Sequence, residues 1–153
     1  MHPIIFAVFT GFLGAVSLSA GATSSAQATS PIAQAATHPH VTMFKSPTCG
    51  CCGKWAEYMR EAGFHVQEQS LEDMTAKKDE LGGPDNLRSC HTAVVDGYVV
   101  EGHVPVDAIT KMLHDKPKTK GIAVPGMPMD SPGMMGDGQE LTVKTFEGAV
   151  LER

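Results

Sequence analysis

Charged side chains are missing from the first forty residues of this 153-residue chain, where no Lys, Arg, Asp or Glu precedes Val41. Every formal charge belongs to the remaining 113 residues (153 − 40), and the net charge is −5. This acidity gives no electrostatic reason to expect nucleic acid or an anionic membrane surface as a partner. Internal repeats are also missing, and the length leaves room for one ordinary domain. A composition of 42% hydrophobic and 19% charged residues indicates a globular chain.

An apolar run without charge opens the chain, from Ile4 to about Leu18. Small residues follow, and the A-x-A pattern of a signal-peptide cleavage site occurs at residues 20–22 and 26–28. We therefore expect residues 1–28 to be a secretory signal peptide rather than an uncleaved membrane anchor. Residues 29–40 are expected to form a flexible linker, and residues 41–153 a folded domain that does not contact the membrane after cleavage.

Cysteine is scarce and clustered. Cys49, Cys51 and Cys52 lie within four positions, and the only other cysteine, Cys90, lies beside His91. Thiolates are soft ligands that favour copper(I), zinc and iron–sulfur centres, and they are also redox nucleophiles. Export makes disulfides usual, but neighbouring Cys51 and Cys52 can hardly pair, and a Cys49–Cys52 bridge closes too small a loop to stabilise much. A structural pair between Cys90 and one of the other three stays open. The spacing favours a metal or redox site over inert packing.

The pattern of apolar residues predicts an α/β domain in the order β-α-β-α-β-β-α. The expected strands are residues 41–45, 64–68, 92–95 and 98–101, and the expected helices are residues 51–62, 71–81 and a third that begins at Pro105. Asp96-Gly97 between the last two strands is a pair favoured by tight hairpin turns. This is the thioredoxin-like arrangement. A Gly/Pro/Met-rich loop at residues 121–138 and an extra strand pair, 141–146 and 149–151, are expected to follow.

This topology brings the cysteines to one edge of the sheet. The triplet follows the first strand at the amino end of a helix, where the dipole favours an anion, so Cys49 and Cys52 should be more acidic than a free thiol. The third strand runs antiparallel to the first, so Cys90 at its start should face the triplet, in a region that lacks the usual proline. The fourth strand returns to the same edge with His103. We therefore expect Cys49, Cys51, Cys52, Cys90 and His103 to meet there.

Other side chains have weaker cases. His91 is more readily explained as an outward-facing strand residue than as a ligand, and His103 as either a ligand or a plain strand-end histidine. The thioethers of Met127 and Met129 suit copper(I), and we expect their loop to line the site. The alternative is a flexible loop whose methionines cover apolar surface. Trp55 is expected in the core.

Four separated motifs resemble those of the CopG-like family, which comprises bacterial periplasmic proteins associated with copper resistance and was long described as a domain of unknown function. They are KSPTCGCCGKW at residues 45–55, LRSCHT at 87–92, EGHVP at 101–105 and AVPGMP at 123–128. The resemblance covers essentially everything after Val41. It implies a thioredoxin-like fold that holds copper through cysteine sulfurs, as a multinuclear cluster. By position, it implies Cys49, Cys52 and Cys90 as the firmest ligands, followed by Cys51 and His103.

The sequence thus predicts an exported, periplasmic copper(I)-binding protein that contributes to copper resistance, with copper ions and other periplasmic copper-handling proteins as partners. Copper redox chemistry is a further hypothesis, because sulfur stabilises copper(I) and imidazole tolerates copper(II). One alternative is a thiol–disulfide oxidoreductase with Cys49 as nucleophile and Cys52 as resolving thiol. The extra thiol of Cys51 and the missing proline argue against it. Another alternative is a structural zinc site built from Cys49, Cys52, Cys90 and His91 or His103.

Overall fold

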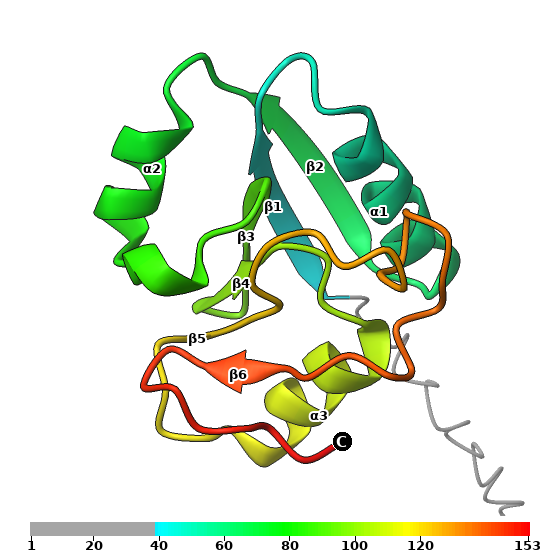
Figure 1. The fold of residues 1–153 in the computed structure, drawn as a ribbon, viewed down its shortest axis with the longest axis vertical. Helices are drawn as coiled ribbons and strands as arrows, with labels where there is room; N and C mark the ends of the chain where they lie inside the picture. Colours follow the sequence, from blue (N-terminus) through cyan, green and yellow to red (C-terminus); the bar gives the residue numbers. More distant parts are fainter. Residues whose placement is uncertain (1–38) are drawn as a thin grey trace, which may run out of the picture. The chain divides into compact units, whose positions relative to one another are not determined.

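The computed structural model describes residues 39–153 (Figure 1). The expected signal peptide, residues 1–28, and nearly all of the expected linker, residues 29–40, lie outside the described residues and stay predictions. None of the helices within residues 39–153 has the length and hydropathy that crossing a membrane requires. The elements are, in chain order, β1 (His40–Lys45), α1 (Gly50–Glu61), β2 (His65–Ser70), α2 (Met74–Leu81), a short 3-10 helix (Asp85–Leu87), β3 (His91–Val95), β4 (Tyr98–Glu101), α3 (Val106–Asp115), β5 (Gly121–Ala123) and β6 (Lys144–Thr145).

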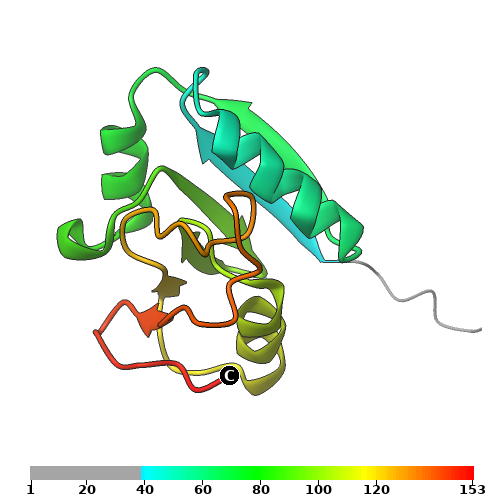
Figure 2. The same ribbon diagram turned by 45° about the vertical axis from the view of Figure 1, so that its right-hand side comes forward.

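The strands form one sheet in the order β2-β1-β3-β4-β5-β6. β1 and β2 are parallel and joined through α1, whereas β3 is antiparallel to both β1 and β4. Figures 1 and 2 show α1 running along β1 and β2, with α2 on the other side of these strands. The predicted thioredoxin-like α/β arrangement is confirmed. Because β3 opposes β1, the start of β3 lies at the same edge of the sheet as the end of β1 and the start of α1.

The hydrophobic core lies between the sheet and helices α1 and α3. α1 contributes Cys52, Trp55, Ala56 and Met59, whose three- and four-residue spacing places them on one helical face. α3 buries Ala108, Ile109 and Met112 in the same cluster. Trp55 is fully buried, as predicted, and its indole Nε1 donates a hydrogen bond of 2.9 Å to the carbonyl of Val104. One face of α1 is therefore fixed against the sheet, and its amino end with it.

The carboxyl-terminal third differs from the prediction in two places. The loop expected at residues 121–138 begins with a strand, β5, which pairs in parallel with β4. Only glycine fits at its first position, because a Cβ on Gly121 would lie 2.2 Å from the carbonyl oxygen of Val99. The expected strand pair at residues 141–146 and 149–151 is shorter than predicted: β6 has two residues, and a single bridge joins Lys144 to Val150.

Candidate metal centre

The amino end of α1 carries three of the four cysteines. After β1, the amide of Cys49 donates to the carbonyl of Ser46 at 3.2 Å, which closes the turn that leads into the helix. Cys49 is the N-cap residue of α1, and its side chain makes no capping hydrogen bond, so its sulfur is left to other partners. Cys51 is half-buried and Cys52 is fully buried. The helix thus presents sulfur both toward the surface and toward the core.

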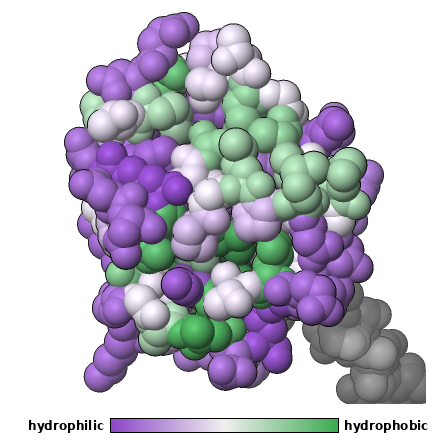
Figure 3. All heavy atoms as spheres, viewed as in Figure 1, coloured by the Kyte–Doolittle hydropathy of each residue, from purple (hydrophilic) through white to green (hydrophobic). Residues whose placement is uncertain are grey.

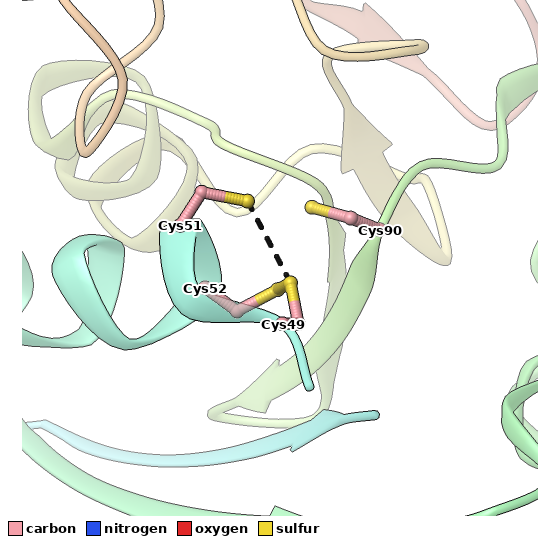
Figure 4. A group of neighbouring side chains, drawn as sticks. All are labelled: Cys49, Cys51, Cys52 and Cys90. Carbon is pink, nitrogen blue, oxygen red and sulfur yellow. Dashed lines mark hydrogen bonds between the residues drawn. A yellow bond between two sulfur atoms is a disulfide. The ribbon is translucent and has the colours of Figure 1, made fainter. Parts of the chain in front are cut away.

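Cys90, at the start of β3, completes a cluster of four sulfurs (Figure 4). The Sγ atoms of Cys49, Cys51, Cys52 and Cys90 all lie within 4.8 Å of one another. Figure 4 shows the side chains of Cys51 and Cys90 pointing toward each other from α1 and the start of β3. The fold therefore brings together sulfurs that are about forty positions apart in the chain, as the topology predicted.

Two of these sulfurs are already bonded to each other. Cys49 and Cys52 form a disulfide with a Cα–Cα distance of 5.4 Å, and Cys51 and Cys90 are free thiols. The sequence spacing did not predict this bridge, although the expectation that so small a loop stabilises little is not contradicted by it. The positions i and i+3 at a helix start share one face and bring the two side chains together. In this state two thiols are available to a metal, and a two-electron reduction would make four available.

His103, just beyond β4, faces Cys90. Its Nδ1 lies 2.7 Å from the carbonyl oxygen of Pro132, and its Nε2 lies 3.1 Å from Cys90 Sγ. A carbonyl can only accept, so in the neutral ring Nδ1 carries the proton and Nε2 has the free lone pair. Burial lowers the pKa of His103, although the hydrogen bond to Pro132 opposes this effect. The ring is thus held neutral, with its basic nitrogen aimed at the sulfur cluster.

His91 is also part of the cluster, and the expectation that it faces outward is wrong. It is fully buried, its ring lies 4.5 Å from that of Trp55 and 5.0 Å from that of His103, and its Nδ1 is 3.5 Å from Cys90 Sγ. β3 is a central strand that is covered on both faces, so strand alternation does not give it a solvent side. Burial lowers the pKa of His91 well below its ordinary value. Cys52, Cys90, His91 and His103 form a second set of donors within 4.8 Å of one another.

Cys90 belongs to both donor sets, and its surroundings keep it protonated. Burial, reinforced by the nearby Cys51, raises the pKa of the Cys90 thiol to about 11. At neutral pH its S–H therefore donates to His103 Nε2. A metal that binds this sulfur must displace the proton, so binding is coupled to proton release. The predicted acidity of Cys49 and Cys52 is not expressed while they form the disulfide, and it stays a prediction.

The methionine loop, residues 124–138 after β5, lies over α1 and His103. Gly133 has a φ of +81°, and a Cβ there would lie 2.7 Å from the backbone nitrogen of Trp55, so the segment packs closely on the helix. Figure 3 shows mildly hydrophobic side chains over the segment that is orange in Figure 1. Met127 and Met129 are 53% and 55% exposed. Their assignment as copper ligands stays a prediction.

The chain has a thioredoxin-like fold, and its cysteine sulfurs and histidine imidazoles meet at one edge of the sheet. Fold and site together place it in the class of thioredoxin-like proteins with a candidate site for a soft metal ion. The particular family follows from comparison with known proteins. Two solved structures of a copper resistance protein CopG are similar to this chain. Form 2 is 38% identical, with 74% of this chain and 94% of that chain covered and a TM-score of 0.66. Form 1 is 42% identical, with 73% and 92% covered and a TM-score of 0.64.

The chain belongs to this CopG family of copper-resistance proteins. A family described as protein of unknown function DUF411 also matches residues 87–134. That stretch includes Cys90, both buried histidines, and Met127 and Met129. No curated protein matches the chain.

Proposed function

We propose that this protein binds copper(I) through a cysteine–thiolate site and thereby contributes to copper resistance. The observation that carries the proposal is the convergence of four sulfurs within 4.8 Å, with the unprotonated Nε2 of His103 directed at one of them. Thiolate sulfur is the donor type that copper(I) prefers, and four crowded thiolates suit metal ions that share sulfurs. The solved relatives are named copper resistance proteins, which supports copper as the metal.

Each side chain has a distinct part in this proposal. Cys51 and Cys90 are half-buried and free, so they meet an incoming copper ion first. Cys49 and Cys52 join them after their disulfide is reduced, which gives a site of four thiolates. His103 supplies a neutral imidazole whose orientation is fixed by Pro132. Met127 and Met129, on the exposed loop, are proposed as thioether contacts for copper in transit.

The proposed setting is the bacterial periplasm, reached through a signal peptide at residues 1–28. Thioether and thiolate donors of this kind would exchange copper with other periplasmic copper-handling proteins, the proposed partners. The net charge of −5 favours neither nucleic acid nor an anionic membrane surface as a partner.

The proposal is tested by anaerobic copper(I) titration of the reduced protein against a chromophoric competitor, with X-ray absorption at the copper edge. We expect tight binding with copper–sulfur scattering. H103A should weaken binding by about tenfold and reduce the copper–nitrogen contribution. H114A is the matched control, because the His114 side chain is 86% exposed. Absence of copper–sulfur scattering in the wild-type protein would refute the proposal.

The disulfide favours a second candidate, a thiol–disulfide oxidoreductase. The bonded Cys49 and Cys52 lie at the helix amino end, which is where such enzymes hold their reactive pair. Turnover of a small disulfide without copper would distinguish the two functions. The enzyme is favoured if C49S abolishes turnover while C51S and C90S leave it unchanged. The copper site is favoured if all three substitutions weaken copper binding and turnover is negligible.

The mixed set of Cys52, Cys90, His91 and His103 favours zinc as the competing metal, since two sulfurs and two imidazole nitrogens form a common zinc site. Chelation followed by addition of zinc or copper(I) alone separates the two. Structural zinc predicts that the fold collapses with the chelator and returns with zinc alone. The copper proposal predicts that residues 41–153 stay folded without metal.

A further inference from the structure

A buried ion pair lies next to the candidate metal centre. Lys78 Nζ in α2 is 2.5 Å from Glu101 Oε1 at the end of β4, and the two side chains are only 6% and 1% exposed. Among the ion pairs within residues 39–153, this is the one in which both partners are buried. Lys78 Nζ also donates to the hydroxyl of Thr92 at 2.7 Å. Neither charge is among the proposed copper ligands.

Glu101 accepts hydrogen bonds from the residues on both sides of the Cys90-His91 pair. Its Oε1 accepts from the backbone N–H of Ser89 at 2.6 Å, and its Oε2 accepts from the Thr92 hydroxyl at 2.5 Å. Ser89 immediately precedes Cys90, and Thr92 immediately follows His91. Glu101 itself is two residues before His103. One carboxylate therefore connects the two segments that carry Cys90 with His91 and His103.

Stability alone does not explain a buried charge pair at this position. Removing two charges from water is costly, and apolar replacements of similar volume are often as stable or more so. An apolar pair could not, however, accept the N–H of Ser89. Ser89 lies two residues before His91, the first ladder residue of β3, so its amide has no strand partner and Glu101 is its acceptor. The capacity to hold this amide is what the carboxylate contributes.

The contacts around Gly102 reinforce the same connection. Gly102 has a φ of +77°, and a Cβ there would lie 2.6 Å from Ser89 Cβ and 2.7 Å from the carbonyl oxygen of Val124. The Ser89 hydroxyl donates to the carbonyl of Gly126, and the Val124 amide donates to the carbonyl of Glu101 at 3.1 Å. The Ser89 segment is thus enclosed between the end of β4 and the start of the methionine loop.

We propose that Lys78 and Glu101 are positioning residues that hold Cys90 and His103 in their metal-binding arrangement through the Ser89 amide. This inference rests on the proposed function, in which Cys90 and His103 hold copper. Lys78 supplies the opposite charge that the buried Glu101 carboxylate requires, and Glu101 fixes the segment that ends at Cys90. Loss of partners of this kind typically weakens metal binding by about 10- to 100-fold.

Two isosteric double variants test the proposal. K78M/E101M makes the pair apolar and removes the acceptor for Ser89, whereas K78M/E101Q is also uncharged but keeps an amide oxygen at that position. We expect copper(I) binding to weaken by at least tenfold in K78M/E101M and to stay within about threefold of wild type in K78M/E101Q. In the metal-free proteins, the Ser89 amide resonance should shift only in K78M/E101M. R60M/E68M, which removes the exposed Arg60–Glu68 pair, should change neither measurement.

A second pair of variants removes the donor instead. S89P removes both the backbone N–H and the hydroxyl. S89A removes the hydroxyl alone and is therefore the control. Proline is compatible with the preceding residue, because Arg88 has a ψ of 144°. S89P should weaken copper binding by at least tenfold relative to S89A. This comparison decides the matter if K78M/E101M does not fold.

The outcomes separate this inference from the proposed function. If wild type binds copper tightly and K78M/E101M or S89P binds it equally well, the positioning role is wrong while the copper site stands. If wild type does not bind copper, the proposed function fails. The positioning of Cys90 is then judged on metal-free protein, where its alkylation rate should differ between K78M/E101M and K78M/E101Q. Equal rates would overturn the inference.

Discussion

Reduction of the Cys49–Cys52 disulfide should change copper binding far more than it changes stability. The bridge closes a loop with a sequence separation of only 3. The chain-entropy relation gives about 1.9 kcal/mol as the stabilisation from so small a loop. The same two-electron reduction raises the number of free thiols in the cluster from two to four. We therefore expect the reduced protein to stay folded and to bind more copper(I), with higher affinity.

The assay compares oxidised and reduced protein anaerobically after removal of the dithiol reductant. Urea denaturation gives the free energy of unfolding, and competition with a chromophoric ligand gives copper(I) affinity and stoichiometry. The C49A/C52A variant is the control, because its copper binding should not respond to the reductant. The reasoning is refuted if oxidised and reduced wild type bind the same amount of copper with the same affinity. Such a result would remove Cys49 and Cys52 from the ligand set.

Three further predictions concern the metal-free protein. Burial lowers the pKa of His103 and lowers that of His91 well below its ordinary value; the unfolded chain therefore takes up protons that the folded chain does not. As the pH is lowered below about 6.5, the free energy of unfolding should decrease by up to about 1.4 kcal/mol per pH unit for each histidine. Urea denaturation between pH 7.5 and 5.5 would check this. G102A should destabilise by about 2–4 kcal/mol in the same assay, since its Cβ meets Ser89. G97A, with φ +82° and open space around the Cβ, should cost only about 1–2 kcal/mol. Alkylation of Cys90, followed by mass spectrometry, should accelerate about tenfold per pH unit until near pH 11, and a plateau near pH 8 would contradict the raised pKa of about 11.

The order of elements and the meeting of the cysteines were predictable from the sequence because both follow from local patterns. Asp96-Gly97 between two β-rich runs specifies the β3–β4 hairpin, and the helical spacing of Trp55 and Met59 specifies the buried face of α1. Once β3 is antiparallel to β1, chain direction alone brings Cys90 to the amino end of α1. The position of the sulfur cluster is therefore a consequence of topology and needs little side-chain detail.

The features that the sequence did not predict depend on packing between distant segments. The burial of His91 requires both faces of β3 to be covered, and nothing in the neighbouring residues indicates this. Lys78 follows Lys77 in a polar helix, so the sequence indicates an exposed side chain. The structure instead buries it 2.5 Å from Glu101, a residue on a distant strand. β5 was not predicted because it lies in a Gly/Pro-rich stretch, which is typical of a loop. Gly121 is required there because the carbonyl of Val99 lies close to it, and not because the chain turns.

The disulfide was not predictable because the same spacing serves a thiol switch and a metal cluster equally well, and this ambiguity has a functional consequence. With the bridge closed, the free thiols of the cluster are Cys51 and Cys90, and Cys90 also lies within 4.8 Å of the imidazoles of His91 and His103. With the bridge open, sulfur dominates. Sulfur-rich sites favour copper(I), whereas imidazole also suits copper(II) and zinc. Under the proposed function, the bond between Cys49 and Cys52 therefore sets the ratio of sulfur to nitrogen donors that the centre can offer to copper.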